Sequence, residues 1–259
     1  MTEKKIIERH FSDTSQVWRD RIYKAKETQH WWEYFDKQYR FDYVVSMITS
    51  IPYPARVLDI GCGAGQLIPV LAEMGYAMDA NDISQNMVNL AKNLCKKTGV
   101  KANIELGDCE NLDYGDNSFD VVVAMGVIEY MDEDTPILRE IFRVLKPGGS
   151  VIITCRNARC GPIKWRTLWL FLIGKMKDSS YQPISRQHDP RQLRIMSEQL
   201  SFKTVQEQYC HYHAVPAPFS HAWPFSWIQA VLGKSMEYFF KNNSVPWLAS
   251  TYILKSEKL

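Results

Sequence analysis

A predicted strand followed by a glycine turn, residues 57–65 (VLDIGCGAG), constrains this chain more than any other segment. The first half is a short apolar run, which is typical of a buried parallel strand. The second half places three glycines at alternate positions before an expected helix over 66–74. Such a turn lets a ligand approach bare backbone and the positive end of a helix. The segment therefore predicts a ligand-binding strand–helix unit or, as the alternative, a tight turn without a ligand.

The spacing of the glycines argues against a dinucleotide as the ligand. A dinucleotide fingerprint needs glycine at its first, third and sixth positions, but the sixth position here is Gln66. Asp59 also lies two residues before the first glycine, where a carboxylate would repel a pyrophosphate. The same carboxylate favours a ligand with an ammonium or sulfonium group, and S-adenosylmethionine (SAM) carries both.

Predicted strands and helices alternate after the glycine turn. This order predicts a doubly wound parallel sheet, whose ligands bind beyond the carboxyl ends of the strands. Ser84 is an expected helix N-cap, and we interpret Lys146 to Gly149 as a structural turn. The expected strands are 76–82, 104–109, 119–125, 150–155, 202–212 and 250–256, and the expected helices are 85–97, 132–145, 190–199 and 223–240.

Two acids follow predicted strands at that edge of the sheet. Asp82 lies 21 residues after Gly61, close to the offset of an acid that binds ribose hydroxyls. Asp108 follows the third strand, where its carboxylate could accept from an adenine amino group. The alternative for Asp82 is an acid that serves a loop or a helix cap.

Five motifs in this order resemble those of class I SAM-dependent methyltransferases. They are similar to the small-molecule branch of that family, typified by ubiquinone-pathway enzymes. The resemblance covers roughly residues 50–157 and implies a Rossmann-like sheet of seven strands, in the order 3-2-1-4-5-7-6 with the last strand antiparallel. It also implies methyltransferase activity with SAM as the cofactor. The motifs are VLDIGCGAG, ANDIS, GDCENL, NSFDVVVAMGVIEYM and REIFRVLKPGGSVIIT.

The resemblance also implies roles for residues at the matching positions. The methionine part of SAM would lie against the glycine turn, the ribose against the acid after the second strand, and the adenine between the second and third strands. The end of the fourth strand would line the sulfonium. The implied cofactor-binding residues are Asp59, Gly61, Cys62, Gly63, Gly65, Asp82, Ile83, Met87, Asp108, Cys109, Met125 and Gly126.

The sequence departs from many relatives directly after the fourth strand. They have Glu-His there, whereas this chain has Glu129-Tyr130, so a proton transfer by that histidine does not carry over. His188 is our first catalytic candidate, because in relatives its segment often approaches the acceptor, and Tyr130 is the second. Any of the histidines could instead be an ordinary surface or core residue. The candidate bases after the fifth strand are His188, His211, His213 and His221.

Aromatic residues are concentrated outside the predicted cofactor half, since 26 of the 32 lie outside residues 44–161. Pockets for bulky ligands are lined with such residues. We therefore expect a single domain in which a helical cap (1–50) and insertions within 158–247 close over the core (51–157), with the last strand in 248–259. The alternative is that these segments simply pack against the sheet.

This distribution favours a hydrophobic small-molecule or lipid-like acceptor, methylated at oxygen. Methylation at carbon of an isoprenoid or polyketide is the alternative. A non-catalytic scaffold with a methyltransferase fold, or a nicotinamide-dependent reductase, would be a function of a different class.

Charge and composition limit the remaining partners. The net charge of +2 indicates no overall polyanion partner, and the Pro-Pro signature of nucleic-acid amino methyltransferases is absent after the fourth strand, so we expect no nucleic acid. Residues 163–177 are basic and apolar, which suits an anionic membrane surface, an anionic or lipidic substrate, or a buried cap helix. The apolar residues around 168–173 favour the buried helix. Scattered cysteines and a polar start of the chain predict a cytoplasmic protein without a metal site.

Overall fold

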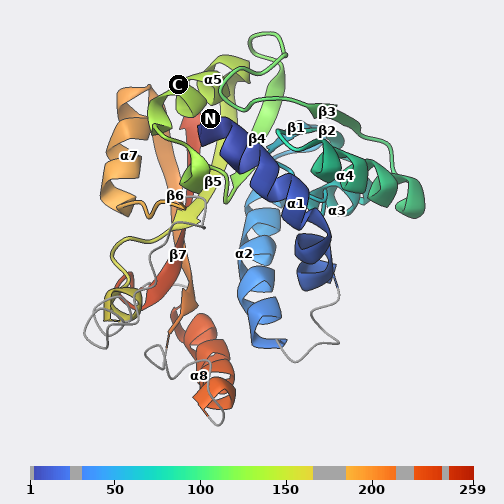
Figure 1. The fold of residues 1–259 in the computed structure, drawn as a ribbon. Coiled ribbons are helices and arrows are strands. Elements are labelled where there is room, and N and C mark those ends of the chain that lie inside the picture. The colour runs from blue at the N-terminus through green and yellow to red at the C-terminus, as the bar shows by residue number, and fades with distance from the viewer. Residues whose placement is uncertain (1–2, 24–30, 166–184, 214–224, 241–244) are drawn as a thin grey trace.

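The protein folds around one sheet of seven strands, with helices on both faces (Figure 1). The structure is a computed structural model, and it describes residues 3–23, 31–165, 185–213, 225–240 and 245–259. The described strands are β1 (Arg56–Ile60), β2 (Ala77–Asp82), β3 (Asn103–Leu106), β4 (Phe119–Met125), β5 (Leu145–Arg156), β6 (Phe202–Tyr212) and β7 (Ala249–Lys258). The helices are α1 (Glu3–Tyr23), α2 (Trp31–Thr49), α3 (Leu67–Glu73), α4 (Gln85–Thr98), α5 (Asp134–Val144), α7 (Pro190–Gln199), α8 (Phe225–Phe240) and the short η2 (Ile128–Tyr130).

The strand order is β3-β2-β1-β4-β5-β7-β6, which confirms the predicted topology. Strands β1 to β5 pair in parallel, and β7 runs antiparallel to both of its neighbours. The order reverses on either side of β1, so the connections from β1 and β4 diverge there. This is the switch point at which open α/β sheets bind their ligands, beyond the carboxyl ends of the strands. We call that side of the sheet the carboxyl edge and the opposite side the amino edge.

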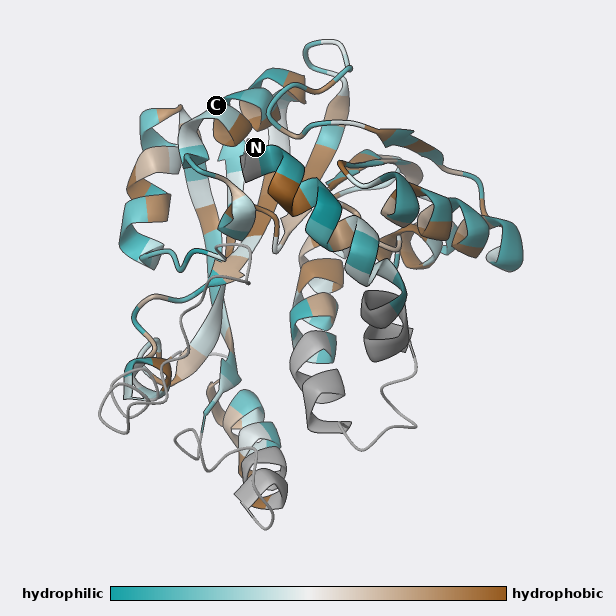
Figure 2. Ribbon diagram, in the orientation of Figure 1, coloured by the Kyte–Doolittle hydropathy of each residue, from teal (hydrophilic) through white to brown (hydrophobic). Residues whose placement is uncertain are grey.

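Alternate residues of the central strands enter two separate cores. Leu58 and Ile60 of β1 pack with α5 and α7 on one face, whereas Val57 packs with α2, α3 and α4 on the other. This two-sided burial explains why the central strands are continuously apolar, as the brown strands in Figure 2 show. The core therefore holds the carboxyl ends of β1, β2 and β4 in a rigid arrangement.

The turn that we predicted at Lys146 to Gly149 lies inside a strand. Strand β5 begins at Leu145, which pairs with Phe119, and its pairing with β4 then shifts register before Val121 pairs with Ser150. Gly148 has a φ of +75°, in the left-handed region that favours glycine. The Pro-Gly-Gly sequence therefore makes an irregularity at the start of the strand and not a separate turn.

Helix α8 carries a stripe at helical spacing (Ile228, Val231, Leu232, Ser235 and Phe239), which we expected to belong to the core or the cap and not to a partner site. Figure 1 shows α8 extending away from the sheet beyond the end of β6. Leu232 and Phe239 are exposed, at 45% and 71%, while Glu237 on the other side of the helix is buried. The buried carboxylate accepts hydrogen bonds from the backbone of His211 and Tyr212. Glu237 therefore joins α8 to β6, and Leu232 and Phe239 are not part of a core.

Several expectations fall on parts of the chain outside the described residues. They include most of the segment 163–177, His221 and the first two residues expected in the helix 223–240. Among the described helices, none combines the length and the hydropathy that a membrane crossing requires. All six cysteines are unpaired thiols.

Candidate functional site

The glycine turn after β1 is held in a conformation that only glycine adopts easily. Gly61, Gly63 and Gly65 all have positive φ, between +55° and +78°. A Cβ at Gly61 would lie 2.4 Å from Val127, and one at Gly65 would lie 2.7 Å from Ala91. A Cβ at Gly63 would meet no atom within 4 Å. The outer glycines therefore permit close packing, and the middle one presents open backbone to a ligand.

Asp82 joins the glycine turn to the end of β2. Its carboxylate accepts hydrogen bonds from the backbone N–H of Gly63 (2.8 Å) and of Ser84 (2.9 Å). Ser84 also caps α4, as predicted, by accepting from the N–H of Met87. Burial raises the pKa of Asp82, and the two backbone hydrogen bonds oppose this shift. Each carboxylate oxygen keeps a further lone pair, which suits a ribose hydroxyl.

Asp59 is a buried acid without a hydrogen-bond partner among the described residues. It is 2% exposed on β1, two positions before the turn. Burial, and secondarily the charge of Asp82, raises the pKa of Asp59 to about 8. Removing a carboxylate from water is costly unless an opposite charge compensates. A cationic ligand group beside the turn would provide that charge.

Asp108 and Cys109 follow β3, next to the N-terminal helix. The Asp108 carboxylate accepts from the Lys4 ammonium (2.5 Å), which also pairs with Glu110. Burial lowers the pKa of Lys4, but the hydrogen bonds to the two acids outweigh it and raise the pKa to about 12. Cys109 is buried, and its Sγ lies 3.6 Å from Sδ of Met131.

Helix α1 continues from this point along the carboxyl edge. Ser12 contacts Ser84 through its hydroxyl (3.0 Å), and Phe11 packs edge-on against Tyr130 at 5.0 Å between ring centroids. Figure 1 shows α1 beside α4, in agreement with the contacts between them. The predicted residues after β2, β3 and β4 therefore all lie close to this one helix.

Met125 and Gly126 end β4 and are half-buried. Gly126 has a φ of +72°, and a Cβ there would lie 3.2 Å from Nη1 of Arg40 on α2. Arg40 makes no hydrogen bond or ion pair with the described part of the chain, and its Nε is buried. An arginine is thus directed at the end of β4 with its donors available.

Glu129 and His188 lie beyond the end of β4, each beside opposite charges. Glu129 is buried and lies 3.3 Å from Nε of Arg156; burial raises its pKa, while Arg156, Arg40 and His188 oppose the shift. His188 is 7% exposed, and its Nε2 lies 3.0 Å from Oδ1 of Asp134. Its Nδ1 is buried without a partner. The histidine therefore has one nitrogen held by an acid and the other available.

Comparison with known proteins agrees with this geometry. Residues 58–153 match a family model described as a methyltransferase domain. These residues contain the glycine turn and both acids, and they form the centre of the sheet with the strand order found above. Residues 58–153 form a methyltransferase domain. The methyltransferase domain thus includes every predicted cofactor-binding residue.

Individual relatives of the methyltransferase domain match part of the chain. A ubiquinone biosynthesis O-methyltransferase from Xanthomonas axonopodis is 33% identical over 119 residues, 46% of this chain and 49% of that protein. One from Coxiella burnetii is 27% identical over 147 residues, 57% of this chain and 60% of that protein. The chain therefore spans about half to three fifths of the curated relatives' length.

A solved structure matches the methyltransferase fold over the whole chain. The magnesium protoporphyrin IX methyltransferase from Synechocystis with bound SAH has a TM-score of 0.72, at 17% identity, and the match covers 100% of both chains. At this identity the likeness concerns the fold alone. It extends to the helices and strands outside residues 58–153.

The remaining described histidine candidates lie outside the methyltransferase domain and away from the glycine turn. His211 is on β6, at the far end of the sheet from β3, and its Nδ1 lies 2.9 Å from the Thr251 hydroxyl. His213 follows the end of β6 and donates its N–H to Leu248. The structure therefore brings only His188 of the described candidates next to the end of β4. Among the residues that the structure describes, no group of three metal-ligating side chains is present.

The sequence motifs of the methyltransferase domain did not reveal four of the charged residues near its site. They come from segments outside the glycine turn and the acids: Arg40 from α2, Asp134 from α5, Arg156 from the end of β5 and Arg186 before α7. Asp134 and His188 are separated by 54 positions in the chain. No spacing rule joins such residues, although the run of Lys and Arg after β5 marks the region as basic.

Proposed function

We propose that this chain transfers a methyl group from SAM to an oxygen of a hydrophobic small-molecule or lipid-like acceptor. The observation that carries the proposal is Asp59, a buried carboxylate without a partner beside a glycine turn that leaves space at Gly63. A phosphate would be repelled there, whereas the ammonium and sulfonium groups of SAM would be attracted. The match of residues 58–153 to a methyltransferase domain supports the same assignment.

The residues at the carboxyl edge suit the three parts of SAM. The methionine part would lie against the glycine turn, with its ammonium near Asp59 and its carboxylate on Arg40, whose donors are unpaired. Asp82 would bind the ribose hydroxyls. Ile83, Met87, Asp108 and Cys109 would surround the adenine, and Lys4 would hold the Asp108 carboxylate in place.

Methyl transfer depends mainly on how the acceptor atom is positioned relative to the methyl group of SAM. SAM supplies a methyl group on a positively charged sulfur, which is an excellent leaving group. The chain must hold the acceptor atom about 3–3.5 Å from that methyl group, in line with the bond that breaks. Positive charge disappears from sulfur during transfer, so apolar surroundings favour the transition state over the bound cation. Met125, Val127 and Cys109 provide such surroundings near the end of β4.

A hydroxyl acceptor also needs a group that removes its proton. His188 is our first candidate: when Asp134 accepts the Nε2 proton, Nδ1 carries the lone pair that can take a proton from the acceptor. Tyr130 is the second catalytic candidate, as a polar group near the expected methyl group and not as a base. Burial raises the pKa of Tyr130, so its phenol keeps the proton near neutral pH and serves as a hydrogen-bond donor to the acceptor.

Transfer of a radiolabelled methyl group from SAM into a cell extract tests the proposal. The products are partitioned between organic and aqueous phases. Base hydrolysis then releases label from methyl esters, and hot hydriodic acid releases it from methyl ethers but not from carbon. We expect base-labile or ether-linked label in the organic phase. Label that survives both treatments on carbon would favour the alternative, a C-methyltransferase on an isoprenoid or polyketide.

A scaffold without catalysis is the competing function of a different class. Calorimetry with S-adenosylhomocysteine (SAH) separates the two, because a scaffold has no need of both acids and the open glycine turn. Absence of SAH binding at about 1 mM, a concentration that detects even very weak sites, would favour the scaffold.

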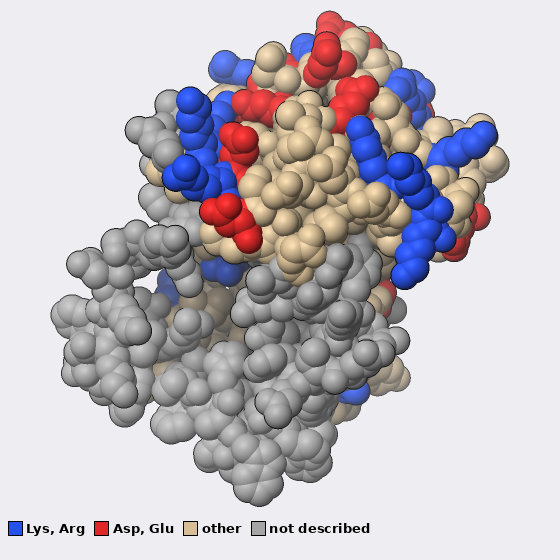
Figure 3. Space-filling model, turned by 45° about the vertical axis from the view of Figure 1, so that its right-hand side comes forward, with Lys and Arg blue, Asp and Glu red and all other residues tan. Residues whose placement is uncertain are grey.

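We further propose a cytoplasmic enzyme without a nucleic-acid partner. Figure 3 shows one face of the molecule, and on its described part basic side chains form separate groups around a mostly uncharged area. A peripheral membrane contact through 163–177 remains a proposal, and Trp165 at its described end is 50% exposed. Flotation with anionic liposomes at low salt tests it.

A further inference from the structure

A group of charged side chains lies beyond the ends of β4 and β5, next to the place that the proposed function gives to the acceptor. Arg156 ends β5, with its Nε 3.3 Å from Glu129 and its Nη1 donating to the Ser185 hydroxyl at 2.9 Å. Arg186 pairs with Asp134, and its backbone N–H donates to the carbonyl of Glu129 at 2.7 Å. These contacts join β5, η2, α5 and the segment before α7 into one cluster.

The cluster has more hydrogen-bonding groups than partners. Nε of Arg186 and Nδ1 of His188 are both buried without a hydrogen-bond partner among the described residues. His188 as a whole is 7% exposed. A buried donor that lacks an acceptor costs about 1–3 kcal/mol. Nε of Arg186 is such a donor, which indicates that a ligand supplies an acceptor oxygen there.

The charges of the cluster favour an anionic ligand. Arg156 and Arg186 balance Glu129 and Asp134, and the proposed function pairs Arg40, on the other side of Glu129, with the carboxylate of SAM. The sulfonium of SAM would then be the positive charge in excess nearby. A neutral acceptor would leave this excess of positive charge uncompensated in surroundings where charges interact strongly.

We propose that Arg156 and Arg186 bind a carboxylate of the acceptor, so that the substrate is an apolar molecule carrying an acidic group. Guanidinium groups present a planar pair of donors that matches the two oxygens of a carboxylate. Arg156 is 52% exposed and Arg186 is 33% exposed, so both are accessible from the side where the acceptor would enter. The proposal rests on the proposed function and adds the chemical class of the substrate.

Binding of two matched probes tests this proposal. We would titrate the protein, saturated with SAH, with 2-naphthoate and with its neutral isostere 2-naphthamide, and follow binding by calorimetry. We expect 2-naphthoate to bind about tenfold more tightly, as the loss of one charge-assisted contact would predict. The preference should disappear in Arg156→Gln and in Arg186→Gln.

Control variants keep the result interpretable. Arg139→Gln removes an exposed arginine of α5 outside the cluster and should retain the full preference. Arg186→Lys keeps the charge but not the planar pair of donors, so this variant should retain part of the preference for 2-naphthoate. SAH binding and thermal unfolding show whether each variant is folded.

Three outcomes would overturn the inference if SAH still binds. The first is equal affinity for the two probes, and the second is a preference for 2-naphthoate that survives both glutamine variants. The third is no binding of 2-naphthoate at about 10 mM, the range of very weak ligands. If the wild-type protein does not bind SAH, the proposed function itself is overturned.

Discussion

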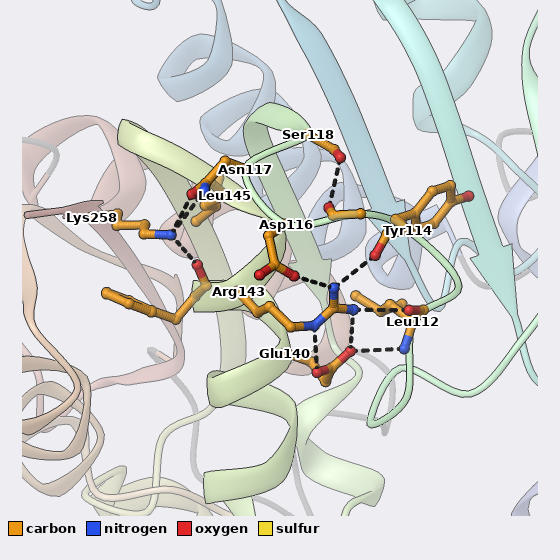
Figure 4. Close-up of polar contacts among 11 residues, drawn as sticks. Leu112, Tyr114, Asp116, Asn117, Ser118, Glu140, Arg143, Leu145 and Lys258 are labelled. Carbon is orange, nitrogen blue, oxygen red and sulfur yellow. Dashed lines mark hydrogen bonds and ion pairs between the residues drawn. The ribbon is translucent and has the colours of Figure 1, made fainter.

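The two edges of the sheet treat the same kinds of charged residues in opposite ways. At the amino edge, Arg143 of α5 uses every donor of its guanidinium, as Figure 4 shows. It donates to both oxygens of Glu140, to Asp116, and to the carbonyls of Leu112 and Tyr114, at distances of 2.7–2.9 Å. Lys258 at the end of β7 likewise donates to Asn117 and to the carbonyls of Phe142 and Leu145.

The carboxyl edge leaves its groups incomplete. Asp59 has no hydrogen-bond donor among the described residues, Arg40 has no acceptor, and buried atoms of Arg186 and His188 have no partner. Buried polar groups are normally satisfied, so unsatisfied ones require an explanation. We infer that the amino edge stabilises the fold by itself, whereas the carboxyl edge is completed by its ligands. Four predictions test that contrast.

The largest expected effect is on stability at the amino edge. Arg143→Met should lower the free energy of unfolding by about 3 kcal/mol, because it removes both side-chain hydrogen bonds to Glu140 and leaves two loop carbonyls without the donors of Arg143. SAH affinity should not change. Urea unfolding and calorimetry measure the two effects. A variant that keeps its stability but loses SAH binding would contradict the contrast between the edges.

The second prediction concerns the proton on Asp59. With its pKa raised to about 8, Asp59 is protonated in the free protein at pH 6, and a cationic ligand binds the ionised form. Binding should therefore release a proton, and SAH affinity should rise with pH by up to about tenfold per unit between pH 6 and 8, then level off.

Calorimetry in buffers of different ionisation enthalpy detects this proton. Asp59→Asn should bind SAH more weakly, with no proton release from this position. Equal heats in phosphate and Tris buffers at pH 7 for the wild-type protein would show that Asp59 is already ionised.

The third prediction concerns Arg40. Arg40→Met should weaken SAH binding about tenfold, because it removes a charge-assisted contact with the ligand carboxylate. The free energy of unfolding should change by less than about 0.5 kcal/mol, since Nε of the wild-type side chain is buried without a hydrogen-bond partner among the described residues. Methylthioadenosine, which lacks the amino-acid part, serves as the control ligand. Equal weakening of both ligands would exclude a contact with the carboxylate.

The smallest expected effect is the pH dependence of the Arg143 network. The hydrogen bonds from Arg143 hold the pKa of Glu140 below its ordinary value. The stability that Glu140 contributes is present above the pKa of the unfolded chain and is lost as the pH falls through the folded pKa. Because the pair is partly exposed, we expect less than about 1 kcal/mol. Urea unfolding of Glu140→Gln between pH 3 and 6 should show a shallower slope; an unchanged slope would assign the pH dependence to other acids.

Elements with strong local signals agree closely with the sequence analysis. Strand β4, helix α7 and strand β6 have the predicted bounds. Each is bounded by residues that act locally, such as Asp189, which caps α7, and Pro190 in its first turn. Lys146 to Gly149 was misinterpreted because strand β5 pairs with β4 both before it, at Leu145, and after it, at Ser150. The exposure of α8 was missed because helical periodicity does not reveal what lies opposite a stripe.

The sequence by itself determined the central sheet and the glycine turn with its acids, because hydrophobic period, caps and glycine spacing act within a few residues of one another. Only the tertiary structure decided that Arg40 is directed at Gly126, that His188 meets Asp134, and that Arg156 and Arg186 surround Glu129. These contacts join segments that are far apart in the chain. They depend on how α2, α5 and the segment before α7 pack on the sheet, which no local pattern encodes.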